Sequence, residues 1–162
     1  MVTKNDLYAY LTCEGVRRGY CTIPEFHVRL PDGRLKKIDL VWATPRRRGP
    51  VQDASNPDYW KLAAAFEIEG CNIRHHRNGM LRHVADFADV RNLRDDEPLQ
   101  RFVVLYTCAH DRAWNHDRDW EEEVAARLAW ETGDAFRIID GRHIGAAIRG
   151  IPRRGAHRRT VL

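Results

Sequence analysis

Three acidic side chains, Asp39, Glu67 and Glu69, have the type and spacing of a divalent-cation site. Side chains alternate between the two faces of a β-strand. In residues 37–40 (KIDL) this alternation puts Lys37 and Asp39 on one face and the two apolar residues on the other. In residues 66–69 (FEIE) the two glutamates likewise share a face. We therefore expect three carboxylates to lie side by side on two neighbouring strands.

Carboxylates between buried hydrophobic residues are costly unless they are paired, hydrogen-bonded or bound to a metal. A divalent cation relieves the repulsion among three of them, and Mg²⁺ prefers carboxylate, water and phosphate oxygens. A metal also makes its bound water a better nucleophile. The alternative is a sheet with one solvated face, where the acids are ordinary exposed residues. The run LAAAF at residues 62–66 favours a buried strand, but the pattern alone leaves both alternatives open.

The elements that must position these acids follow from hydrophobic periodicity and turn residues. The sequence predicts one α/β domain over residues 1–162, a sandwich with a mixed sheet. Residues 44–59, which hold three prolines, predict a long loop. The predicted elements are a helix over 3–18, strands over 22–30, 35–43 and 62–69, a helix over 77–90, a strand over 101–108, a helix over 117–132, a strand over 135–139 and a helix over 141–149.

The composition limits the binding partners and the cellular location that we expect. Only four of the 27 basic residues are lysine, and arginine favours bidentate phosphate contacts, although a GC-rich genome produces the same bias. Residues 141–162 hold six arginines and no acid, which fits either a phosphate-binding segment or a solvated tail. The four cysteines show no C-x-x-C pair, so we expect free, mostly buried thiols. Without a long apolar run or an apolar signal core, we expect a soluble cytoplasmic protein.

Two stretches resemble the core motifs of the PD-(D/E)xK, or restriction-endonuclease-like, nuclease superfamily: KKIDLVWA at 36–43 and LAAAFEIEG at 62–70. In that superfamily an Asp on one strand precedes D/E-x-K on the next. Asp39 matches the Asp and Glu67 matches the D/E, whereas Glu69 stands where lysine is usual. The resemblance covers about residues 3–90. It implies a restriction-endonuclease-like sandwich whose central mixed sheet is flanked by helices.

The resemblance also implies an activity: a Mg²⁺- or Mn²⁺-dependent endonuclease that hydrolyses phosphodiester bonds of DNA, with RNA not excluded. Asp39, Glu67 and the carbonyl of Ile68 would hold the metal, and Glu14 of the first helix would be a further ligand. A homodimer is expected, because such small nucleases often dimerise to cut both strands. Restriction or phage defence would be a typical setting.

The departure at Glu69 leaves the activation of water open. Some members with glutamate at this position still cleave, so Glu69 itself is the first choice, Lys37 the second and Lys61 a remote third. The departure also supports an alternative, a catalytically inactive nuclease-fold module that binds nucleic acid or a partner protein. Contacts to the nucleic-acid backbone are expected from Arg46, Arg47, Arg48, Arg74, Arg77, Arg153 and Arg154.

Overall fold

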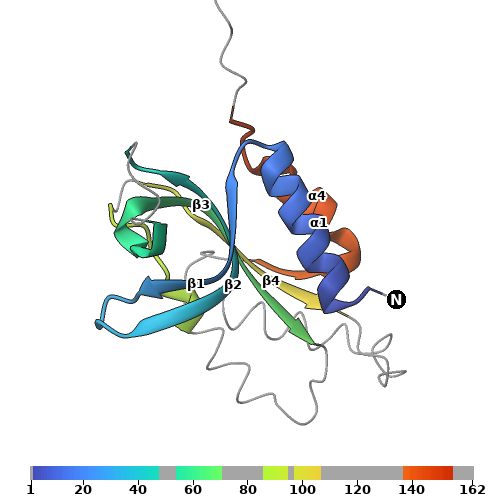
Figure 1. Cartoon of the computed structure of the whole chain (residues 1–162). Helices are drawn as coiled ribbons and strands as arrows, with labels where there is room; N and C mark the ends of the chain where they lie inside the picture. Colours follow the sequence, from blue (N-terminus) through green and yellow to red (C-terminus); the bar gives the residue numbers. More distant parts are fainter. Residues whose placement is uncertain (1, 48–53, 71–85, 95–96, 107–136, 155–162) are drawn as a thin grey trace, which may run out of the picture.

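The computed structural model describes residues 2–47, 54–70, 86–94, 97–106 and 137–154 (Figure 1). Their central feature is a five-stranded sheet in the order β1-β2-β3-β4-β5. Strands β1 to β3 pair antiparallel, and β3 to β5 pair parallel. This confirms the predicted α/β class and the mixed sheet. The strands are β1 (Cys21–Arg29), β2 (Leu35–Pro45), β3 (Trp60–Gly70), β4 (Gln100–Tyr106) and β5 (Arg137–Asp140).

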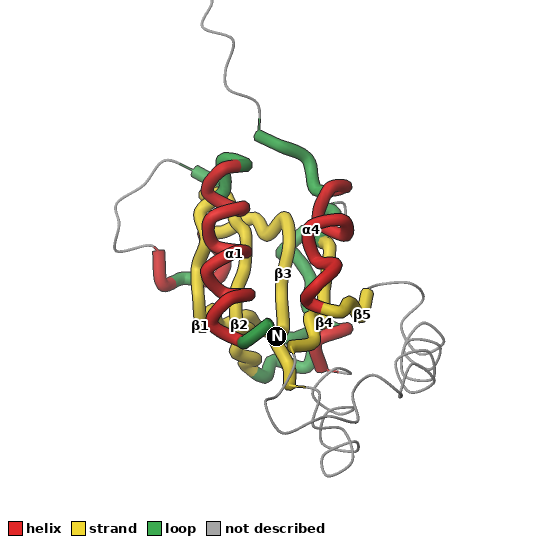
Figure 2. The backbone as a smooth tube through the Cα atoms, turned by 90° about the vertical axis from the view of Figure 1, so that its right-hand side faces the viewer, coloured by secondary structure: helices red, strands yellow, loops and turns green. Residues whose placement is uncertain are grey.

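Helix α1 (Lys4–Arg17) begins at a capping box, in which the Thr3 hydroxyl and the Asp6 carboxylate each accept a hydrogen bond from the other residue's backbone N–H. Its buried residues recur one helical turn apart, and they pack on one face of the sheet. Helix α4 (Ile144–Ala147), between the 3-10 turns η4 (Gly141–His143) and η5 (Ile148–Gly150), packs on the same face (Figure 2). The predicted first and last helices are therefore confirmed in outline.

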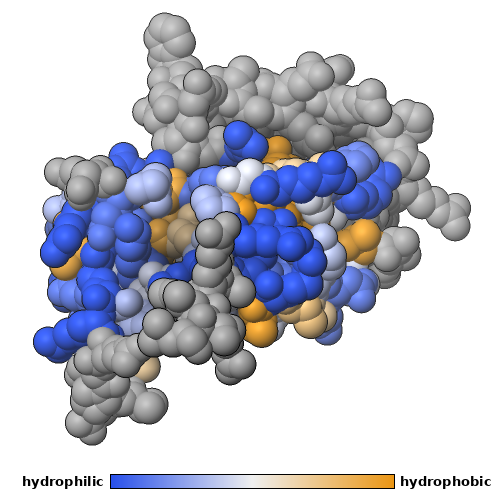
Figure 3. Space-filling view, turned by 90° about the horizontal axis from the view of Figure 1, so that it is seen from above, coloured by the Kyte–Doolittle hydropathy of each residue, from blue (hydrophilic) through white to orange (hydrophobic). Residues whose placement is uncertain are grey.

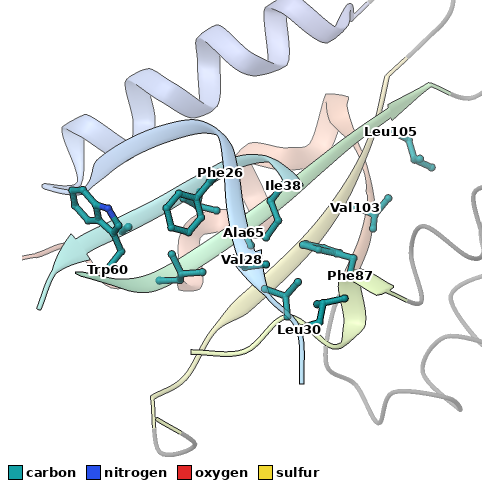
Figure 4. Close-up of a cluster of buried hydrophobic side chains, with 13 residues drawn as sticks. Phe26, Val28, Leu30, Ile38, Trp60, Ala65, Phe87, Val103 and Leu105 are labelled. Atoms are coloured by element: carbon teal, nitrogen blue, oxygen red, sulfur yellow. The ribbon is translucent and has the colours of Figure 1, made fainter. Parts of the chain in front are cut away.

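The opposite face of the sheet carries a second hydrophobic core, in which side chains from β1 to β4 gather with Phe87 (Figure 4). Phe87 belongs to a short helical stretch at residues 86–88. This stretch falls within the helix predicted over 77–90, whose earlier part lies outside the described residues. The helix predicted over 117–132 also lies outside them. The sheet is thus covered by apolar contacts on both faces, as expected for a strand such as β3 in its centre.

The hairpin of β1 and β2 is kinked at Glu25, which has a φ of +52° and directly follows Pro24. This left-handed conformation is uncommon for a residue with a side chain. The paired positions run from Pro24–Leu40 to Phe26–Ile38, so Glu25 lies opposite Asp39. As a result Ile38 packs in the Phe87 core while Leu40 packs against the helices. The prediction that Ile38 and Leu40 share one face is therefore wrong.

The surface of the described residues includes two cysteines and is mostly polar. Cys13 and Cys21 are free and exposed, so the expectation of buried thiols is wrong for these two, and Cys71 and Cys108 lie outside the described residues. Among the described residues no helix is both long enough and apolar enough to cross a membrane. Viewed from above in Figure 3, the described surface is largely hydrophilic with small hydrophobic areas.

Candidate metal centre

The three acids predicted from the sequence meet where strands β2 and β3 separate. Pairing between these strands extends from Pro45–Trp60 to Leu40–Phe66, and Asp39 and Glu67 are the next residues. One carboxylate oxygen from each of Asp39, Glu67 and Glu69 lies within 4.8 Å of the other two. Asp39 and Glu69 are partly exposed, whereas Glu67 is buried. The cluster therefore consists of one buried acid and two partly exposed acids.

Asp39 is held by a strand on one side and a helix on the other. Its Oδ2 accepts a hydrogen bond from the backbone N–H of Ile68 at 2.8 Å, which ties β2 to β3. The Lys4 ammonium lies 3.4 Å from its Oδ1. The Tyr8 hydroxyl donates to the backbone carbonyl of Asp39 at 2.9 Å. Burial and the nearby Asp39 charge raise the pKa of Tyr8, so the phenol stays a neutral donor at physiological pH.

Glu67 forms an ion pair that the sequence did not suggest. Its Oε1 lies 2.9 Å from Nζ of Lys36, and the two side chains are only 2% and 7% exposed. Lys36 lies on the same side of β2 as Ile38, and Val28, which is opposite it in the hairpin, belongs to the Phe87 core. Burying either charge alone would be expensive, so each partner stabilises the other.

The two lysines that the sequence suggested for activating the water, Lys37 and Lys61, form ion pairs with acids outside the cluster. Lys37 forms an exposed ion pair with Glu25, which lowers the pKa of Glu25 and raises that of Lys37. Lys61 lies six residues before Glu67 on β3, about 20 Å away along the strand, and its ammonium is 3.9 Å from Glu97. Both ammonium groups therefore have an ion-pair partner outside the three acids, although the nearby charges of Asp39 and Glu67 also contribute to the raised pKa of Lys37.

Glu14 is not brought to the cluster either. It pairs with Arg17 at 2.8 Å and with Arg18 at 3.4 Å, and these contacts lower the pKa of its carboxyl group. Ten residues of helix separate it from Lys4, which is about 15 Å of rise. The N-terminal end of α1, marked N in Figure 1, therefore lies at the acids, because Lys4 contacts Asp39. The prediction of Glu14 as a ligand is wrong for this reason, and α1 contributes Lys4 and Tyr8 instead.

The arginines expected to contact nucleic acid have different surroundings. Arg46 makes two hydrogen bonds of 2.6 Å to the carboxylate of Glu97, so its guanidinium is engaged inside the protein. Arg47 and Arg153 are exposed. Arg154 is also exposed and lines a cavity of about 360 Å³ together with Lys61, at the end of β3 away from the acids. Arg48, Arg74 and Arg77 lie outside the described residues.

The donor set fits a hard divalent cation. Carboxylate oxygens are the preferred ligands of Mg²⁺, Mn²⁺ and Ca²⁺. Two oxygens bound to one Mg²⁺ lie at most about 4.2 Å apart, which is twice the bond length of about 2.1 Å. Since the three oxygens here are already within 4.8 Å of one another, small side-chain rotations are enough to bring them to one ion.

Comparisons with protein-family models, with curated proteins and with solved structures found no match for this chain.

Proposed function

We propose that the chain is a metal-dependent endonuclease that hydrolyses phosphodiester bonds of DNA. The observation that carries this proposal is the convergence of Asp39, Glu67 and Glu69, within 4.8 Å, at the point where two central strands separate. Such a cluster suits Mg²⁺ or Mn²⁺, which bind carboxylates and phosphate oxygens together. When bound, the metal would supply an activated water and stabilise negative charge on the phosphate.

The residues have separate proposed roles. Asp39 and Glu67, with the carbonyl of Ile68, would hold the metal. Glu69 is a partly exposed member of the cluster, and it is our choice for orienting the attacking water. The exposed arginines Arg47 and Arg154 would contact the nucleic-acid backbone.

The proposal includes the fold family. In a restriction-endonuclease-like core, a helix is followed by three strands with the acids on the second and third. The order α1, β1, β2, β3, followed by a parallel β4, is compatible with such a core. A homodimer, action on RNA as well as DNA, a cytoplasmic location and a role in restriction or phage defence remain parts of the same proposal.

The test is cleavage of supercoiled plasmid with Mg²⁺ or Mn²⁺. The variants Asp39→Asn and Glu67→Gln remove one charge each with little change of shape. A matched control is Asp32→Asn, because Asp32 is an exposed acid in the hairpin turn, paired with Arg34. We expect the wild type and the control to cleave. The two site variants should lose more than the roughly 10–100-fold typical of losing a group that only supports a ligand. Equal cleavage by all four proteins would refute the assignment.

One observation favours a second candidate, an inactive nuclease-fold module that binds nucleic acid or a partner protein. Lys4 and Lys36 already lie against Asp39 and Glu67, so two of the three negative charges are balanced by the chain itself. This candidate predicts binding of a labelled DNA duplex that weakens steeply with added KCl. It also predicts no cleavage with any divalent metal, whereas the endonuclease requires cleavage with at least one.

A further inference from the structure

Lys36 is the only buried one of the four lysines in the chain. It lies opposite Val28 in the hairpin, and its neighbours Val28 and Ile38 belong to the Phe87 core. A buried ammonium requires a compensating charge, and Glu67 supplies it at 2.9 Å. This lysine is therefore held inside the protein, in contact with the buried acid of the candidate metal centre.

Lys36 and Lys4 differ in what they can do when a cation arrives. Lys4 is a long, flexible side chain that is 42% exposed, so its ammonium can move from Asp39 into solvent. Lys36 is only 7% exposed, and moving its ammonium into solvent would leave the buried Glu67 carboxylate without this counter-charge. The positive charge of Lys36 must therefore remain beside Glu67 whether or not a metal is bound.

We propose that Lys36 is a built-in counter-ion of the metal centre, which stabilises the metal-free protein and weakens its affinity for divalent cations. This inference rests on the proposed function. The ammonium of Lys36 offsets one negative charge of the cluster, so the cluster attracts a divalent cation less than it would without this lysine. The negative charge of a substrate phosphate raises that attraction, so Lys36 makes metal loading depend on bound nucleic acid.

The test is calorimetric titration of MnCl₂ into the full chain at pH 7.5. Lys36→Met removes the charge and keeps a similar chain length. We expect it to bind Mn²⁺ at least about tenfold more tightly than the wild type. The matched control is Lys61→Met, which removes an exposed lysine about 20 Å away along β3. Its affinity should change less than about threefold, because an exposed charge is screened by solvent. Lys36→Arg keeps the charge and should behave like the wild type.

Lys36→Met leaves Glu67 without its ion pair and will be less stable in chelator. If it fails to fold there, recovery of the folded circular-dichroism signal on addition of MnCl₂ supports the counter-ion role. Failure to recover, or Mn²⁺ affinity equal to or weaker than that of the wild type, overturns it. If neither the wild type nor Lys36→Met binds Mn²⁺, the proposed function itself fails. If the wild type binds and Lys36→Met does not bind more tightly, only the counter-ion role fails.

Discussion

Replacing Asp39 with asparagine removes one charge from the acid cluster while keeping its shape. The amide oxygen can still accept the hydrogen bond from Ile68, which measures 2.8 Å in the native protein. The contact with Lys4 is lost, but this ammonium is 42% exposed. Such a pair contributes at most about 1 kcal/mol.

Losing the Lys4 contact lowers the stability of Asp39→Asn, whereas relieving the repulsion among the three acids raises it. At 4.8 Å and an effective dielectric constant of about 20, two carboxylates repel by about 3 kcal/mol. Asp39 takes part in two such pairs, and the Lys36 ammonium beside Glu67 offsets part of the repulsion in one of them. We therefore predict that Asp39→Asn is as stable as the wild type, or more stable, when a chelator removes all metal.

With added Mn²⁺ the wild type should become more stable than Asp39→Asn. A ligand at one hundred times its Kd stabilises the folded state by about 2.7 kcal/mol. For a chain of this size that corresponds to a rise in Tm of roughly 5–10 °C. We expect this rise for the wild type and for the control Asp32→Asn, and less than about 2 °C for Asp39→Asn.

Thermal unfolding followed by circular dichroism, with EDTA or with millimolar MnCl₂, gives both comparisons. An equal rise in the wild type and in Asp39→Asn would refute a metal centre that includes Asp39. A large loss of stability in Asp39→Asn without metal would refute the role of repulsion in the metal-free cluster.

Three further predictions follow from the described contacts. Arg46→Ala should lower the free energy of unfolding by roughly 2 kcal/mol in urea titrations at pH 7. Because Arg46 lowers the pKa of Glu97, this stabilisation should be complete above about pH 4.3, the unfolded value, and be lost as the pH falls through the folded pKa. Gly15→Ala should destabilise by about 1–3 kcal/mol, measured by thermal unfolding, because its Cβ would lie 2.6 Å from Nε1 of Trp42. Arg154→Ser should reduce the salt dependence of DNA binding, measured by fluorescence anisotropy, by about one unit of slope.

The acid cluster could be predicted because its signal is local. Glu67 and Glu69 alternate with the buried residues Phe66 and Ile68 on one strand, and the fold keeps that alternation. Asp39 was found in the same way, although the alternation of β2 breaks between Ile38 and Leu40. Its position survives because its backbone and carboxylate are tied to Tyr8 and Ile68.

The lysine beside Glu67 could not be found by the same alternation. Counting alternate residues back from Asp39 leads to Lys37, but the alternation breaks between Ile38 and Leu40. Lys36 lies on the side of β2 that carries Ile38, and there it pairs with Glu67. Pro24 carried the only sequence signal, because a proline within a strand often marks an irregularity in its pairing.

The contribution of α1 depended on long-range packing. The sequence predicted the helix and its buried face, but not which end of the helix lies beside the acids. The structure puts Lys4 there and leaves Glu14 with the arginines at the other end. In the same way, no local pattern indicated that Arg46 would pair with Glu97, which lies 51 positions later in the chain.

An anomalous difference map from crystals soaked in MnCl₂ tests the proposed metal centre most directly. We expect a single strong peak within bonding distance of carboxylate oxygens of Asp39 and Glu67, and its loss in crystals of Asp39→Asn. Saturating Mn²⁺ without a peak between these residues, or an unchanged peak in the variant, would refute a metal centre at these acids.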